Sequence, residues 1–188
     1  MNKRVLVLIL FTYFSLFSIF VNGEETTSPI NVIKYYINDL NKNKWEEATY
    51  WWDKESRKEL LNFIANKEKQ KYKHGLLNIK EANLVRWKEL PYEYGKQYLP
   101  NRYIEKFNNP RVFYVGINYK VHSQNKYFIN GVNYFLIAMV LEDGMWKIAL
   151  SPHVPVQSLI YDGYGFGTED EKAYTERRLK FYNNEIDY

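Results

Sequence analysis

The segment from residue 111 to 152 constrains the fold most strongly, because its hydrophobic pattern is that of three consecutive antiparallel strands. In its first part, every second residue from 113 to 121 is apolar, which places this set on one face of a strand. The next run, residues 127–141, is apolar on both faces, as expected for a strand that is covered on both sides. Asp143 and Gly144 follow, and they predict a tight hairpin turn because both central residues of a type I′ turn need positive φ.

The first residues have the pattern of an export signal. Lys3 and Arg4 precede an apolar run over residues 5–21, and small or permissive residues follow up to Gly23. We expect cleavage after Gly23, which makes residues 1–23 a signal peptide and the mature chain extracytoplasmic, either secreted or associated with the cell envelope. The alternative is that the run is not cut and anchors the protein in a membrane, since it is just long enough to span one.

Composition excludes several classes of protein. The chain has no cysteine, so disulfides, thiolate metal sites and lipid attachment at an N-terminal cysteine are excluded. Basic and acidic side chains nearly balance once Lys3 and Arg4 are removed with the leader, so there is no electrostatic case for binding nucleic acid. The aromatic content of 18%, which includes 18 tyrosines, is interpreted first as packing material, with platforms for stacking sugars as the alternative.

The patterns before residue 111 predict helices followed by a strand. Ser28 and Pro29 begin a helix whose apolar stripe runs from Ile30 to Leu40 at helical spacing. A short helix from Trp45 to the Trp51-Trp52-Asp53 cluster and a third helix over 55–66 are expected next, followed by a solvated charge run over 67–73. Residues 78–90 predict a strand with a bulge, and residues 91–110 predict a lid or Ω-loop.

The residues after the three strands predict a helical tail. Residues 154–160 are interpreted as a turn or short helix, and the Gly and aromatic residues of 163–167 as a flexible loop. Thr168 is followed three positions later by Glu171, a capping box that predicts a last helix reaching about Tyr182. The weak apolar stripe of this helix favours loose packing or a contact with a partner.

Three short motifs carry a resemblance to a known family. They are Trp45 after a short helix and an Asn-Lys break, Gly131-Val132-Asn133-Tyr134 in the long strand, and the run from Glu142 to Ile148. With the order of elements, they resemble the nuclear-transport-factor-2-like superfamily over residues 29–150, in particular small exported proteins of low-GC Gram-positive bacteria. The resemblance implies an α+β fold in which a curved antiparallel sheet wraps the first helix as a cystatin-like cone with a pocket at its open end. The chain then divides into a signal peptide, this domain over 24–152, and a C-terminal extension over 153–188.

Candidate catalytic residues are Asp53, His153 and Tyr119. Asp53 follows two tryptophans, and a carboxylate beside apolar rings suits base catalysis; the alternative is that Asp53 caps the third helix. His153 lies between two prolines, where it would line a pocket mouth or serve a structural role. Tyr119 is on the inward face of its strand. The inward faces of the three predicted strands carry no Asp or Glu. Because isomerases of the resembled superfamily place a carboxylate inside the cone, this departure favours a protein that is not an enzyme.

No cofactor or metal is expected. The three histidines are scattered without an i, i+4 pair, which makes a poor metal site. The glycines of residues 163–167 lack the spacing and the preceding strand of a dinucleotide fingerprint. If the cone holds a ligand, Trp51, Trp52 and Arg86 are expected to shape or charge its pocket.

One face of the long strand remains apolar after the cone is filled. This face carries Tyr134, Leu136, Ala138 and Val140, and either the C-terminal helix or a second copy of the chain must cover it. We favour an interaction surface, with a protein partner or a homodimer ahead of a small apolar or sugar ligand. The leading hypothesis is therefore an exported, non-catalytic binding or assembly module at the cell envelope. The rival hypothesis is a small enzyme that carries out proton-transfer chemistry in the cone.

Overall fold

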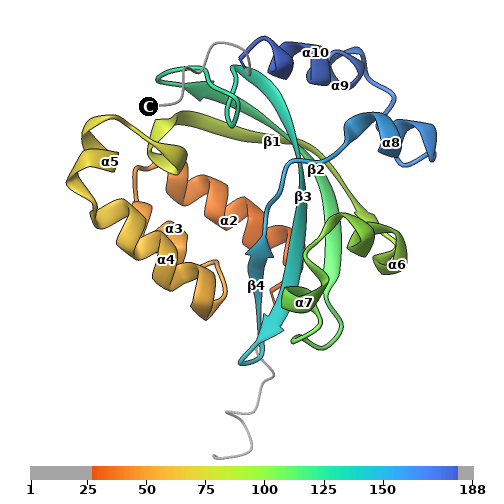
Figure 1. Cartoon of the computed structure of the whole chain (residues 1–188). Coiled ribbons are helices and arrows are strands. Elements are labelled where there is room, and N and C mark those ends of the chain that lie inside the picture. Colours follow the sequence, from red (N-terminus) through yellow and green to blue (C-terminus); the bar gives the residue numbers. More distant parts are fainter. Residues whose placement is uncertain (1–26, 182–188) are drawn as a thin grey trace, which may run out of the picture.

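An antiparallel sheet forms the centre of the computed structural model, which describes residues 27–181 (Figure 1). In this part of the chain the sheet has four strands in the order in which they occur in the sequence, and the fold is α+β as predicted. The strands are β1 (Ile79–Leu90), β2 (Arg111–Val121), β3 (Gly131–Glu142) and β4 (Met145–Leu150).

Helices cover both faces of the sheet (Figure 1). One face is packed by α2 (Pro29–Asn41), α3 (Trp45–Thr49), α4 (Lys54–Ala65) and the 3₁₀ turn η1 (Gly75–Asn78). The short helix α5 (Lys67–Lys71) lies beside α4 and η1 and buries none of its own residues. The other face is packed by α6 (Tyr92–Gly95), η2 (Lys96–Tyr98), α7 (Asn101–Ile104), α8 (Val156–Tyr161), α9 (Glu169–Lys172) and α10 (Tyr174–Leu179).

The predicted hairpin and strand bulge are both present. β2 and β3 pair without a register shift from Arg111↔Met139 to Tyr119↔Gly131. The β3–β4 turn places Asp143 at φ 51° and Gly144 at φ 78°, which are the positive values that a type I′ turn requires. The β1–β2 register shifts between Leu84 and Arg86, so β1 carries the expected irregularity.

The two faces of the sheet belong to two separate cores. On the first, alternate β2 side chains pack beneath the α2 stripe, whose centre at Ile33 is 0% exposed. The second core is centred on β3, where Tyr134, Leu136, Ala138 and Val140 are each 0% exposed beneath residues of α8 and α10. These four residues are therefore not available for the intermolecular contact that the sequence analysis favours. The chain's own residues, from the segment 91–110 and from the C-terminal part, provide the cover instead, because that apolar face must be removed from water.

Side-chain networks attach the C-terminal residues to the sheet. Arg86 Nη1 on β1 donates to Asp170 Oδ2 at 2.7 Å and to Thr168 Oγ1 at 2.8 Å. The Glu171 carboxylate is 0% exposed and accepts from the Tyr114 hydroxyl at 2.7 Å and from two backbone N–H groups of the 163–167 loop. The predicted capping box is thus wrong, because Thr168 makes no side-chain cap bond and Glu171 binds the preceding loop. The single last helix is also wrong, since α9 ends before α10 begins.

Both outer edges of the sheet have partners. Beside β4, the Asp53 N–H donates to the Ile148 carbonyl at 3.0 Å and the Ile148 N–H donates to the Trp51 carbonyl at 2.8 Å. Beside β1, the Asn41 side chain donates to the Ala82 carbonyl and accepts from its N–H. These contacts satisfy edge groups that would otherwise be open to pairing with another chain.

Candidate functional site

A large cavity lies at the end of the sheet where η1 approaches the β2–β3 connection. Its volume is about 830 Å³. Its walls come from the end of α4, from α5 and the residues that follow it, from the 123–128 part of the β2–β3 connection, and from residues 151–153 after β4. We call it the end cavity. It has the size of a small-molecule site, for which roughly 300–1,000 Å³ is usual.

Asparagine side chains fix the wall formed by the β2–β3 connection. Buried Asn78 on η1 donates to the Ser123 carbonyl at 2.7 Å and accepts from its N–H at 2.9 Å. Asn125 Oδ1 accepts from the N–H groups of Tyr127 and Phe128, both at 2.9 Å. An asparagine that binds backbone two and three residues ahead holds a turn in one conformation. The two aromatic residues are therefore held in place by the loop that carries them.

Aromatic rings supply most of the apolar surface of the end cavity. The lining rings are Phe63, Tyr72, Tyr127, Phe128 and Phe135. Tyr72 and Tyr127 are 58% and 55% exposed and stand at the rim, whereas Phe128 and Phe135 contact Tyr119 in the first core. The cavity therefore offers rings whose faces and edges a ligand can reach.

The charged side chains of the end cavity all have one sign. Lys69, Lys73 and Lys126 line it, and none of its described lining residues is acidic. Lys69 Nζ lies 5.9 Å from the centre of the Phe63 ring, and Lys126 Nζ lies 5.3 Å from the centre of the Tyr127 ring. Among the described lining residues, charge is therefore contributed by lysines, and the aromatic walls provide a low-dielectric surface beside them.

His153 lies in the wall of the end cavity, at a place that fits one of the two roles left open for it by the sequence. Its Nδ1 is 3.0 Å from the Tyr174 hydroxyl, and its ring centre is 4.8 Å from that of Phe135. Burial, with a smaller contribution from the charge of Arg178, lowers the pKa of His153 to about 4. The imidazole is therefore neutral near pH 7, and its low pKa makes it a weak general base.

The depressed pKa of His153 predicts a loss of stability in acid. Its folded pKa of about 4 lies below its ordinary value of 6.5, so its contribution is complete above pH 6.5 and is lost as the pH falls from 6.5 toward 4. Between about pH 7 and about pH 4.5, the free energy of unfolding is expected to fall by on the order of 2 kcal/mol more in the natural protein than in His153→Gln. Urea unfolding at both pH values measures this difference. Exposed His122→Gln is the control, and an equal pH dependence in all three proteins would contradict the prediction.

Asp53 and Tyr119 do not line the end cavity. Asp53 is 1% exposed, and its Oδ1 accepts from the N–H groups of Glu55 and Ser56 at the start of α4. The same oxygen accepts from the Tyr103 hydroxyl at 2.6 Å. The interpretation of Asp53 as a helix cap is therefore the one confirmed. Tyr119 is 5% exposed, and burial raises its pKa well above the ordinary value. Asp53 and His153 bind different tyrosines and share no cavity, so they do not form an acid–base pair.

The residues expected to shape a ligand pocket are also dispersed. Trp51 Nε1 donates to Asp39 Oδ2 at 2.7 Å, and Trp52 packs edge-on against Tyr36 within the first core. Arg86 lies on the other face of the sheet, in the network with Asp170. None of the three predicted residues lines the end cavity, because the alternation along β1 and the turn before α4 direct them elsewhere.

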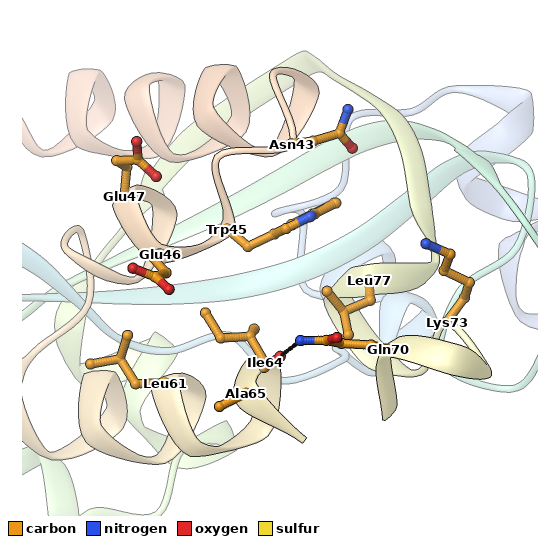
Figure 2. A pocket seen from close by; sticks show the side chains of 10 residues that line it. All are labelled: Asn43, Trp45, Glu46, Glu47, Leu61, Ile64, Ala65, Gln70, Lys73 and Leu77. Atoms are coloured by element: carbon orange, nitrogen blue, oxygen red, sulfur yellow. Dashed lines mark hydrogen bonds between the residues drawn. The ribbon is translucent and has the colours of Figure 1, made fainter. Parts of the chain in front are cut away.

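A second cavity of about 470 Å³ lies between α3, α4 and the residues after α5 (Figure 2). Figure 2 shows Glu46 and Glu47 at one end of this space and Lys73 at the other, with the Gln70 amide held by its bond to the Ile64 carbonyl. Its lining charges are of both signs, so they favour no ligand charge. The end cavity is therefore the stronger candidate site.

The sequence analysis missed the lysines and rings that line the end cavity. The sequence analysis predicts a solvated charge run over 67–73 and assigns no role to residues 123–128. One signal is visible in both: a lysine precedes a tyrosine at Lys71-Tyr72 and again at Lys126-Tyr127. Only the fold brings the two segments together, because more than fifty residues separate them.

Comparison of the chain with protein-family models, with curated proteins and with solved structures gives no match. Within residues 27–181, no group of three or more side chains is arranged to hold a metal ion. In the same range, no helix has both the length and the hydropathy needed to cross a membrane. The predicted signal peptide, with its cleavage position, lies outside the described residues.

Proposed function

We propose that this chain is an exported, non-catalytic binding module that takes a small organic ligand into the end cavity. The observation that supports it best is a cavity of about 830 Å³ that is lined by five aromatic rings and, among its described lining residues, has no paired carboxylate and imidazole. In this proposal the curved sheet and α2 form the cone of the nuclear-transport-factor-2-like superfamily, and the end cavity is its open end. The export pattern of residues 1–23 places the site outside the cytoplasm, at the cell envelope or in the medium.

The rival proposal, proton-transfer catalysis, has less support. A general base must lie within hydrogen-bond reach of the proton that it removes, either directly or through one water. The only ionisable side chains that line the end cavity, within the described chain, are three lysines, two histidines and two tyrosines. Of these, His153 has a pKa of about 4, which is poorly matched to base catalysis near pH 7.

Filling the end cavity is expected to abolish binding. Ser151 is half-buried in its wall, so Ser151→Trp places an indole in the space that a ligand would occupy. The neutral fluorescent probe N-phenyl-1-naphthylamine is expected to bind the natural protein with a Kd in the micromolar range and the variant at least about ten-fold more weakly. Glu59→Trp, at an exposed position of α4, is the control and is expected to bind as the natural protein does.

The fold of each variant is checked by circular dichroism. Ser123→Trp, at the exposed rim, tests the same point if Ser151→Trp does not fold. Unchanged probe binding in a folded filled variant would show that the probe binds elsewhere, and it would contradict the proposed site.

A further inference from the structure

A third cavity, of about 620 Å³, lies over the second core, where η2 meets the end of α8. We call it the tyrosine cavity. Its described lining residues carry two phenol rings, an amide, a hydroxyl, an alkyl chain and a single carboxylate, and they are Tyr98, Gln157, Ser158, Ile160, Tyr161 and Asp162. Among these residues the carboxylate is the only charged group, so the tyrosine cavity differs from the end cavity in the sign of its charge.

Tyr161 presents its ring to solvent at the edge of the tyrosine cavity. The helix that carries it, α8, buries Val156 and Leu159 in the second core, whereas Tyr161 is 91% exposed. Within residues 27–181, Tyr161 makes no side-chain hydrogen bond and no ring contact. Its ring is therefore accessible to a ligand on both faces.

Tyrosine hydroxyls hold the carboxylate of Asp162 in place. The Tyr94 hydroxyl donates to Asp162 Oδ2 at 2.8 Å and lies 3.3 Å from the Tyr98 hydroxyl. Burial, with smaller contributions from these hydrogen bonds, raises the pKa of Tyr94, so its hydroxyl keeps the proton that it donates. The Tyr94 ring also packs against those of Tyr98 and Tyr164, with ring centres 5.7 and 4.1 Å apart. The carboxylate and the Tyr98 ring are thus positioned before any ligand arrives.

The charge of Asp162 is not neutralised by a basic side chain. Within the described chain Asp162 forms no ion pair, although two lysines belong to neighbouring short helices. Lys96 on η2 pairs with Glu93 at 2.5 Å, and Lys172 on α9 pairs with Glu169 at 2.7 Å. A carboxylate beside aromatic rings and without a basic partner attracts a cation from solvent and repels an anion.

We propose that the tyrosine cavity binds small organic cations, with an alkylated ammonium group against the rings of Tyr98 and Tyr161 and beside the carboxylate of Asp162. The face of an aromatic ring attracts a cation through its quadrupole, and quaternary ammonium ligands are commonly held by aromatic residues in this way. The carboxylate adds the opposite charge. This site is separate from the end cavity, so the inference does not depend on the proposed function.

Two probes of the same shape separate charge from apolar contact. Choline carries a trimethylammonium group, and 3,3-dimethyl-1-butanol has an uncharged tert-butyl group in the same place. At low salt the natural protein is expected to bind choline with a Kd in the millimolar range and at least about five-fold more tightly than the alcohol. This preference is expected to shrink as salt is raised. Titrations followed by NMR spectra of the isotope-labelled protein measure both affinities.

Two single variants assign choline binding to the tyrosine cavity. Tyr161→Leu removes the exposed ring but keeps an apolar side chain, and Asp162→Asn removes the charge but keeps an oxygen that can accept from Tyr94. Each is expected to weaken choline binding at least about five-fold. The controls are Tyr35→Leu and Glu59→Gln, at exposed positions of α2 and α4, and both are expected to bind choline as the natural protein does.

The outcomes distinguish this site from the end cavity. Ser151→Trp is expected to retain choline binding, and its loss in that variant would place the cation in the end cavity and refute the proposal. Equal binding of the two probes, no binding of choline, or equal weakening by the control variants would also refute it, and none of these results bears on the naphthylamine probe. Circular dichroism of each variant shows whether it is folded, and either cavity variant alone suffices for the test.

Discussion

Leu136→Ala is expected to lower the free energy of unfolding by about 2–5 kcal/mol, because it removes a fully buried side chain from the centre of the second core. Leu136 is 0% exposed on β3, with residues of α8 and α10 packed above it. The loss combines the transfer free energy of the deleted groups with the cost of the cavity that they leave. Urea unfolding followed by circular dichroism measures it.

Leu141→Ala is the matched control, since Leu141 lies on the same strand but is 45% exposed. It is expected to change the free energy of unfolding by no more than about 0.5 kcal/mol. Light scattering of residues 24–188 shows whether one chain suffices to cover this face. A dimer that Leu136→Ala dissociates would contradict the packing described above and would restore the contact favoured by the sequence.

Glu171→Ala is expected to cost on the order of 3 kcal/mol in the free energy of unfolding. The carboxylate is fully buried and accepts from the Tyr114 hydroxyl and from the N–H groups of Phe166 and Gly167. Removing it leaves several buried donors without an acceptor, and each costs about 1–3 kcal/mol unless water reaches it. Thermal and urea unfolding measure the loss.

Glu169→Ala provides the comparison for Glu171→Ala on the same short helix. The side chain of Glu169 is 89% exposed and forms an ion pair with Lys172 on the same short helix, so its removal is expected to cost less than about 0.5 kcal/mol. Equal losses in the two variants would mean that the 163–167 loop is not held by the buried carboxylate. Tyr114→Phe, which removes one donor together with its need for an acceptor, is expected to cost less than Glu171→Ala.

The parts of the fold that were predicted correctly have local signals. Asp143 and Gly144 fixed the β3–β4 turn through their tolerance of positive φ, and the stripe from Ile30 to Leu40 identified α2 and its buried side. Asp53 was correctly interpreted as a helix cap, because an acceptor side chain just before a helix binds its first N–H groups whatever lies around it.

The errors concern segments whose local signal is weak or ambiguous. No residue of α5 is buried, so its five residues show no inward stripe and were interpreted as a solvated run. Its N-cap residue, Asn66, accepts from the N–H groups of Glu68 and Lys69. An asparagine at this position is a signal for the start of a helix, but no periodic apolar stripe follows it. Glu171 has the spacing of a capping box, but its carboxylate accepts from the N–H groups of Phe166 and Gly167 in the preceding loop instead.

By itself, the sequence determined the order of helices and strands, the tight turn and the need to cover both faces of β3, since these follow from backbone preferences and from the burial of apolar side chains. An apolar face requires cover from water, but it does not specify which surface provides that cover. Only the tertiary structure decided that residues of 91–110 and of the C-terminal part cover the second face. It also decided the candidate site. Lys69, Lys126 and His153 meet at one cavity because the sheet folds distant segments together, and no pattern within any one segment records that meeting.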